Sequence, residues 1–142
     1  MTRRRVPLPT VETVIDATIR LLLVDDEARV RQGLRMCMAG EPDFDVVGEA
    51  EEGGAAVGLA AELSPDVVVL DLRMRGLGGI EAARALADQQ PSARVVVLSL
   101  QDDANTRREA IASGATAFVG KQEGIARLFE VIRAVACGGD SN

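Results

Sequence analysis

Residues 65–71 of the chain read PDVVVLD, so that four apolar residues run without interruption from Val67 to Leu70 and end at Asp71. A continuous apolar run rich in β-branched residues is typical of a strand that is buried on both faces, as in a parallel sheet. Four similar runs flank this one, at Leu21–Val24, Phe44–Val47, Val95–Leu98 and Ala117–Val119. The sequence therefore predicts five largely buried strands.

The segments between these runs have the spacing of amphipathic helices. Val30, Leu34, Cys37 and Met38 fall on one helical face, and the last segment repeats the pattern at Ile125, Leu128, Phe129, Ile132 and Val135. Glycines at positions 40, 114 and 138 stand where helices commonly end. Five strands alternating with five helices predict an α/β fold, a doubly wound five-stranded parallel sheet built by right-handed crossovers.

Composition excludes several classes of function. The chain has 142 residues, the size of one domain, and a net charge of −6, which disfavours a broad nucleic-acid surface. It has no His, which excludes Ser-His-Asp triads, Cys-His dyads and His-containing zinc sites. Cys37 and Cys137 are too far apart for a CxxC motif; we expect reduced packing residues, with a disulfide between them as the alternative.

The ends of the chain differ from its middle. Three arginines and two prolines near the start predict that residues 1–18 form an exposed tail, disordered or carrying a short helix, with a docking element as the alternative. Residues 19–138 form the predicted domain, and residues 139–142 a C-terminal tail or the start of a linker. There is no secretory signal and no apolar run of about 18 residues, so we expect a cytoplasmic protein without a membrane-spanning helix.

Chemically active side chains follow the predicted strands. Asp25 and Asp26 follow the first strand, Asp71 the third, Ser99 ends the fourth and Lys121 comes just after the fifth. The carboxyl ends of parallel strands meet at one edge of the sheet, where two carboxylates about 4 Å apart repel by about 4 kcal/mol at an effective dielectric near 20. A hard cation, Mg²⁺ above all, would relieve this repulsion. The set has the parts needed for phosphoryl transfer onto an aspartate.

Four stretches of the chain are similar to a known family. They are IRLLLVDDEARVRQGL (19–34), PDVVVLDLRMRGLGGIEA (65–82), ARVVVLSLQDD (93–103) and AFVGK (117–121). They resemble the receiver domain of bacterial two-component response regulators, over residues 19–138. EPDFDVVGEAEEG (41–53) and VVVLDLRM (67–74) are typical of receivers that carry a LuxR-type helix-turn-helix output domain. The resemblance implies a flavodoxin-like fold of the receiver type.

The resemblance also implies an acceptor and a metal site. Asp71 would be the phospho-acceptor and would take its phosphoryl group from a histidine of a sensor kinase. Mg²⁺ would be bound directly by Asp26 and Asp71, largely through water by Asp25, and by the backbone carbonyl of Arg73.

The same family pattern assigns the phosphate-binding and switch residues. Ser99 and Lys121 would each contact a phosphoryl oxygen. Ser99 would then move toward the phosphate, and Phe118 would rotate inward to fill the vacated space. The surface from Asp103 to Val119 would change shape and bind a partner, which we expect to be a second receiver in a homodimer.

One loop departs from the family pattern. In receivers, the loop that follows the phospho-acceptor usually reads MPGMDG, whereas residues 74–79 of this chain read MRGLGG. The proline that stiffens the loop is absent, and so is the aspartate that would cap the next helix. No expected ligand is lost, so we expect the phosphorylation chemistry to be retained.

The favoured function is a phosphorylation-dependent signalling receiver, not an enzyme with a diffusible product, that serves transcriptional control. DNA would be contacted only through an output domain absent from this chain, as in a receiver cut from a longer regulator; a stand-alone receiver is the alternative. Two other functions are weighed against it: a pseudo-receiver that acts without phosphate, and a flavodoxin-like flavin or nucleotide binder. The complete set of site residues disfavours the first. The absence of a glycine-rich phosphate loop and of stacking aromatics disfavours the second.

Overall fold

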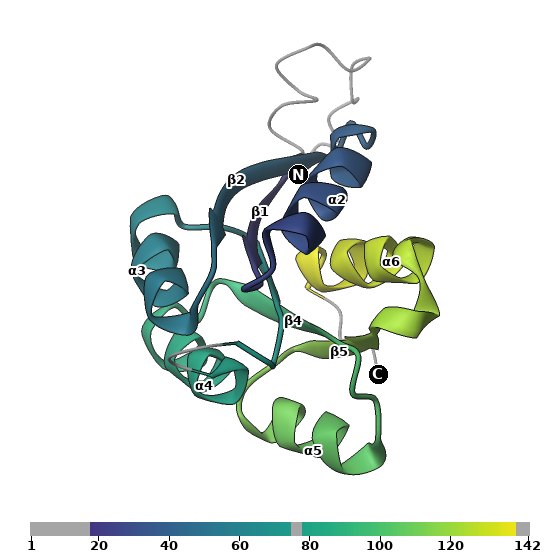
Figure 1. Ribbon diagram of the computed structural model, residues 1–142. Helices are drawn as coiled ribbons and strands as arrows, with labels where there is room; N and C mark the ends of the chain where they lie inside the picture. The colour runs from purple at the N-terminus through teal and green to yellow at the C-terminus, as the bar shows by residue number, and fades with distance from the viewer. Residues whose placement is uncertain (1–17, 75–77, 139–142) are drawn as a thin grey trace, which may run out of the picture.

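The computed structural model describes residues 18–74 and 78–138, so the predicted tail, except for Thr18, lies outside the described residues. Strands and helices alternate along the chain (Figure 1). In order they are β1 (Ile19–Val24), α2 (Ala28–Ala39), β2 (Phe44–Ala50), α3 (Gly53–Leu63), β3 (Val67–Leu70), α4 (Gly79–Gln89), β4 (Arg94–Ser99), α5 (Ala104–Ala112), β5 (Ala117–Gly120), the 3-10 turn η1 (Lys121–Glu123) and α6 (Ile125–Ala136).

The five strands form one parallel sheet in the order β2-β1-β3-β4-β5, which confirms the predicted fold class. β2 extends to Ala50, three residues beyond its predicted end at Val47, because Gly48, Glu49 and Ala50 continue to pair with β1. Most of β2 is only half-buried at the edge of the sheet. An edge strand needs no continuous apolar run, so its sequence pattern understated its length.

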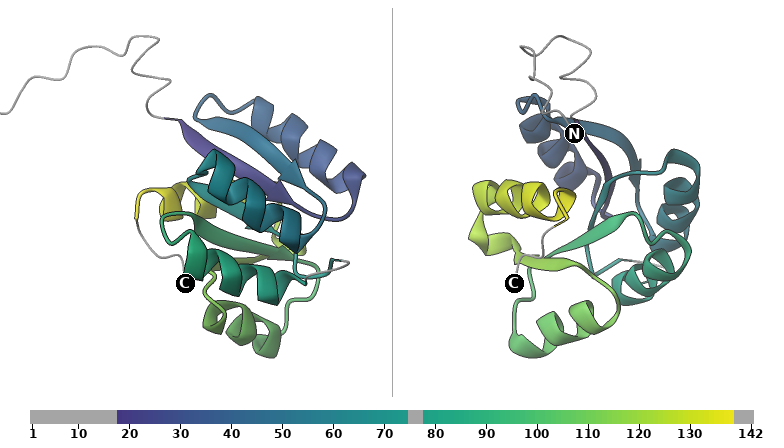
Figure 2. Two further views of the ribbon diagram at one scale, coloured as in Figure 1. Left: turned by 90° about the vertical axis from the view of Figure 1, so that its left-hand side faces the viewer. Right: turned by 180° about the vertical axis from the view of Figure 1, so that it is seen from behind.

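Helices cover both faces of the sheet (Figure 2). On one face, α2 and α6 pack over side chains that include Val67 and Val69, and on the other, α3, α4 and α5 pack over Val68 and Leu70. Because successive side chains of a strand point to opposite faces, both sides of β3 must be apolar. This explains the uninterrupted run from Val67 to Leu70. Among the described residues, no helix is both long enough and apolar enough to cross a bilayer.

The prediction that the two cysteines are packing residues is wrong. Cys37 and Cys137 are both exposed, and both are free thiols, so no disulfide joins them. α2 buries only Leu34 and Met38, and Val30 is half-buried. Cys37 lies at the margin of that stripe, where α2 faces the solvent-open groove beside α6.

Candidate phosphorylation and metal site

Two of the predicted site residues are held by the backbone of the sheet itself. The Asp71 N–H donates to the Val24 carbonyl at 2.9 Å, and the Asp25 N–H donates to the Ala50 carbonyl at 3.1 Å. Each aspartate is thus the first residue beyond its strand, yet is still bonded to the neighbouring strand. This extension of the strand pairing fixes both residues at the carboxyl edge of the sheet, as the sequence predicted.

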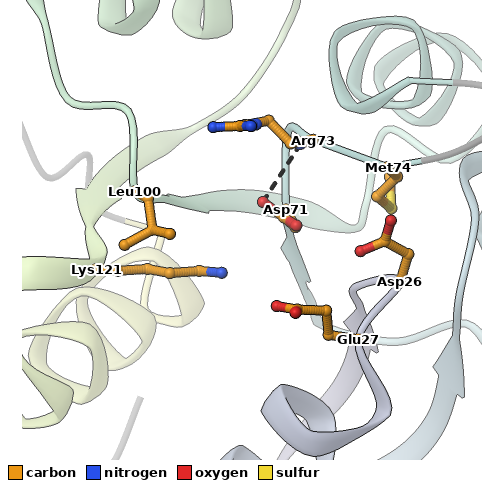
Figure 3. Close-up of a pocket in the computed structure, with 7 residues that line it drawn as sticks. All are labelled: Asp26, Glu27, Asp71, Arg73, Met74, Leu100 and Lys121. Atoms are coloured by element: carbon orange, nitrogen blue, oxygen red, sulfur yellow. Dashed lines mark hydrogen bonds between the residues drawn. The ribbon is translucent and has the colours of Figure 1, made fainter.

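The three predicted carboxylates come together. One oxygen each from Asp25, Asp26 and Asp71 lies within 4.8 Å of the others, and Asp25 and Asp71 are only 4% and 7% exposed. They adjoin an open cavity of about 450 Å³ (Figure 3). Its lining residues are Asp26, Glu27, Asp71, Arg73, Met74, Leu100 and Lys121.

Lys121 supplies the positive charge that pairs with the carboxylate cluster. It starts η1, directly after β5, and its side chain reaches across the cavity toward the carboxylates (Figure 3). Its Nζ lies 3.4 Å from Oδ2 of Asp25, and the side chain is only 19% exposed. The pocket has a net negative charge, because four acidic residues outnumber two basic ones, and this charge favours a divalent cation. The acidic residues are Asp25, Asp26, Glu27 and Asp71, and the basic ones are Arg73 and Lys121.

Burial raises the pKa of Asp71 to about 6. The negative charges of Asp25 and, more weakly, Asp26 act in the same direction. Lys121 and the backbone N–H of Arg73, which donates to Oδ1 of Asp71 at 3.3 Å, oppose the rise. Asp71 is therefore a carboxyl group whose ionisation responds to any additional positive charge placed in the pocket.

The chain folds back tightly behind Asp71. The Gly79 N–H donates to the Leu72 carbonyl at 3.1 Å. A Cβ atom at Gly79 would lie 2.6 Å from the Asp71 carbonyl oxygen and 2.3 Å from the Leu72 Cα, closer than atoms can approach. Only glycine allows the start of α4 to lie against the residues that follow β3. The sequence alone did not reveal this contact.

Gly78 is the residue that precedes α4, and it offers no side-chain cap. This confirms the prediction that the helix lacks its capping aspartate. Positions 75–77 of the same loop, with the Arg75 departure from the family pattern, lie outside the described residues.

Ser99 and Phe118 lie on the paired strands β4 and β5, where Val97 is opposite Phe118 and Ser99 is opposite Gly120. Ser99 is fully buried at the end of β4, and its Oγ accepts a hydrogen bond from the Gln101 N–H at 3.1 Å. Phe118 in β5 is 8% exposed and belongs to the core cluster under α3, α4 and α5. The guanidinium of Arg107 lies 4.7 Å from its ring centroid. Phe118 is thus close to the sheet edge but faces α5 rather than the acidic pocket.

The donor set fits Mg²⁺. The pocket offers clustered carboxylate oxygens and neither imidazole nor thiolate, and such oxygen-only sites suit small hard cations. The cavity also leaves room for the water molecules that Mg²⁺ retains in most protein sites.

The sequence profile of the response regulator receiver domain family matches residues 21–133. The chain belongs to this family. The transcriptional regulatory protein LiaR of Bacillus subtilis (strain 168) is 38% identical to this receiver over 120 residues, which cover 84% of the chain and 57% of LiaR. The transcriptional regulatory protein DegU of Brevibacillus brevis is 34% identical over 128 residues, covering 90% of the chain and 54% of DegU.

A solved LuxR-family two-component response regulator from Aurantimonas sp. SI85-9A1 has the same fold as this receiver, with a TM-score of 0.84. The two sequences are 35% identical, and the match covers 88% of this chain and 89% of the solved chain. The resemblance to LuxR-type receivers is therefore confirmed. The receiver spans little more than half the length of LiaR and DegU.

Sequence reasoning missed several residues of the site. Met74 and Leu100 line the cavity, and Leu100 is 69% exposed despite its apolar side chain. Each directly follows a predicted strand end or lies in the loop after it, so their positions along the chain were a usable signal. Arg31 was also missed, and its NH1 donates to the backbone carbonyl of Asp25 at 2.5 Å.

Proposed function

We propose that this receiver accepts one phosphoryl group on Asp71 from a phosphohistidine of a sensor kinase, in a Mg²⁺-dependent reaction. The observation that carries the proposal is the meeting of Asp71 with Asp25, Asp26 and Lys121 in one open pocket. In this proposal the receiver modifies itself and releases no diffusible product of its own.

The residues have distinct tasks in the transfer. A carboxylate oxygen of Asp71 forms the new bond to phosphorus as the phosphorus–nitrogen bond of the phosphohistidine breaks, and the imidazole nitrogen keeps the electron pair and takes a proton. The ammonium of Lys121 points toward the carboxylates, so it would contact one oxygen of the transferred phosphoryl group. The Ser99 hydroxyl would donate to another of these oxygens after its hydrogen bond with the Gln101 N–H breaks.

Asp26 and Asp71 would hold the cation directly, with Asp25 acting largely through water and the Arg73 backbone carbonyl completing the protein ligands. When bound, Mg²⁺ would neutralise charge on both the carboxylates and the transferring phosphoryl group. Asp71 must be ionised to attack, so a neighbouring positive charge that lowers its raised pKa favours the reaction.

A direct test uses a small-molecule donor in place of the kinase. Incubation with Mg²⁺ and acetyl phosphate should add the mass of one phosphoryl group to the wild-type protein, measured by intact-mass spectrometry. Asp71→Asn should gain none, because the amide is not a nucleophile of this kind. An equal gain in Asp71→Asn, or none in the wild type, would exclude Asp71 as the acceptor and favour the pseudo-receiver alternative.

We infer that the signal leaves through the surface formed by α5 and β5, from Asp103 to Val119. A cavity of about 580 Å³ lies on this surface and is lined in part by Ile111, Phe118 and three arginines. Arg107 stacks on Phe118 while donating to Asp102 and Glu123, at 2.5 and 2.9 Å. Rotation of Phe118 would disturb its contact with Arg107 and the ion pairs that Arg107 makes on the surface, and this change is what a partner would detect. We expect that partner to be a second receiver.

The output of the whole protein is proposed from its relatives. LiaR and DegU are named as transcriptional regulatory proteins. We propose a cytoplasmic regulator in which a further domain, outside this chain, contacts DNA in response to phosphorylation of the receiver.

A further inference from the structure

Arg31 connects the acidic loop that follows β1 to the neighbouring edge strand β2. It lies in the first half of α2, and its side chain is 14% exposed, low for an arginine. NH1 of Arg31 donates to the backbone carbonyl of Asp25 at 2.5 Å, while Nε donates to Oε1 of Glu49 at 3.1 Å. One guanidinium thus joins the carbonyl of a candidate metal-site residue to a carboxylate on β2.

The two ends of this bridge are fixed independently. Glu49 pairs with Leu23 in the sheet, and the next residue, Ala50, accepts the hydrogen bond from the Asp25 N–H at 3.1 Å. Both backbone polar groups of Asp25 are therefore tied to the end of β2, one directly and one through Arg31. The Asp25 side chain is restrained as well, since Oδ1 accepts from the Glu27 N–H at 2.9 Å.

Arg35 provides an internal comparison. It lies one turn further along α2, and it also donates to Glu49, through the other carboxylate oxygen. Its side chain is 48% exposed, and its recorded hydrogen bond is to Glu49 and not to Asp25. The two arginines share a partner and differ in their contact with the acidic loop.

We propose that Arg31 is a positioning residue that holds the Asp25–Asp26 loop in the geometry that binds the divalent cation. The proposal rests on the metal site of the proposed function. A planar guanidinium can hold two acceptors in fixed directions, which an ammonium cannot. Partners that orient metal ligands without touching the metal commonly contribute 10- to 100-fold to metal affinity.

The sign of the effect separates positioning from simple electrostatics. Arg31 is a positive charge close to the carboxylate cluster, so if charge were its whole contribution, its removal would tighten Mg²⁺ binding. If Arg31 positions the loop, its removal weakens binding despite the more negative pocket. A purely structural role lowers the melting temperature and leaves the Mg²⁺ affinity unchanged.

The experiment measures the melting temperature of the full chain against MgCl₂ concentration at constant ionic strength, and derives the dissociation constant of Mg²⁺ for each variant. Arg31→Met keeps the long apolar stem and should weaken Mg²⁺ binding about tenfold or more. Arg31→Lys keeps the charge, and should also bind Mg²⁺ more weakly than the wild type. The matched control, Arg35→Met, should stay within about twofold of the wild type, and Asp26→Asn marks the loss of a ligand.

Three outcomes would overturn the proposal. The first is unchanged or tighter Mg²⁺ binding by Arg31→Met. The second is wild-type Mg²⁺ affinity in Arg31→Lys, the variant used if Arg31→Met does not fold. The third is a loss of Mg²⁺ affinity in Arg35→Met equal to that in Arg31→Met. The acetyl phosphate reaction of the wild type is scored separately. A wild type that binds Mg²⁺ but takes no phosphate contradicts the proposed function alone, whereas a wild type that binds no Mg²⁺ removes both.

Discussion

At the scale of single residues, the chemistry of the site depends on the burial of Asp71. Its pKa rises from the ordinary value of 3.8 to about 6 because the carboxyl group is desolvated and faces two other aspartates. A buried acceptor is protected from water, yet it is harder to ionise. Lys121 offsets only part of this penalty, so the pocket is prepared for a cation rather than neutralised by its own residues.

The raised pKa predicts how stability depends on pH. The folded state holds the Asp71 proton more tightly than the unfolded state, so this group stabilises the fold below about pH 4, and the contribution is lost as the pH rises to about 6. Asp71→Asn has no titrating group at this position, so its stability does not fall over this pH range for this reason. In EDTA, its free energy of unfolding relative to the wild type should therefore rise across this range, by about 1 to 2 kcal/mol after allowing for solvent screening.

Urea titrations between pH 4 and 7.5 would measure this difference, with m-values compared to confirm that both proteins unfold in the same way. Saturating Mg²⁺ should stabilise the wild type more than Asp71→Asn above pH 6. A difference between the two proteins that does not change with pH would contradict the raised pKa.

At the scale of elements, α4 begins without a side-chain cap at the point closest to the acceptor. Gly78 has φ −69° and ψ 170°, an extended conformation that any residue can adopt. A Cβ added there would meet only the mobile end of the Glu81 side chain, at 2.7 Å. Gly78 is therefore a replaceable residue, whereas Gly79, packed against Asp71 and Leu72, is required by close approach.

Restoring the cap should stabilise the receiver. Gly78→Asp supplies an acceptor for the free N–H groups of the first turn and is expected to raise the free energy of unfolding by about 1 kcal/mol. Gly78→Ala is the matched control and should give no net gain, because the reduced freedom of the unfolded chain is offset by the poorer fit of Ala at the N-cap. Chemical denaturation separates the two effects. Equal stabilisation by both variants would show that the Asp side chain does not cap α4.

At the scale of the whole molecule, the proposed function predicts that phosphorylation changes the assembly of the receiver. We expect beryllofluoride, a stable mimic of the phosphoryl group, to shift the receiver from monomer to dimer in sedimentation velocity experiments with Mg²⁺. Amide exchange should change across Asp103 to Val119. Arg107→Met should weaken the dimer, because it releases the contact between Phe118 and the surface carboxylates.

The same experiment with Asp71→Asn is the negative control, since the mimic needs the acceptor carboxylate. Beryllofluoride that leaves the wild type monomeric, with exchange across Asp103 to Val119 also unchanged, would exclude this surface as the output route.

The sequence by itself determined the fold class and the carboxylates that meet at one edge of the sheet. Uninterrupted apolar runs specify strands buried on both faces, and alternation with helices specifies a parallel sheet, so residues that follow those strands, such as Asp25 and Asp71, must meet at one edge. These conclusions need only local patterns and one topological rule.

Tertiary structure decided what depends on distances between segments far apart in the chain. The raised pKa of Asp71, the contact of Gly79 with the acceptor strand and the bridge from Arg31 to Glu49 each combine groups that no local pattern relates. The exposure of Cys37 was mispredicted for the same reason, because helical spacing gives a direction but not the width of the face that a neighbouring helix covers. Packing of whole elements sets those distances, and with them the electrostatics and the support of the site.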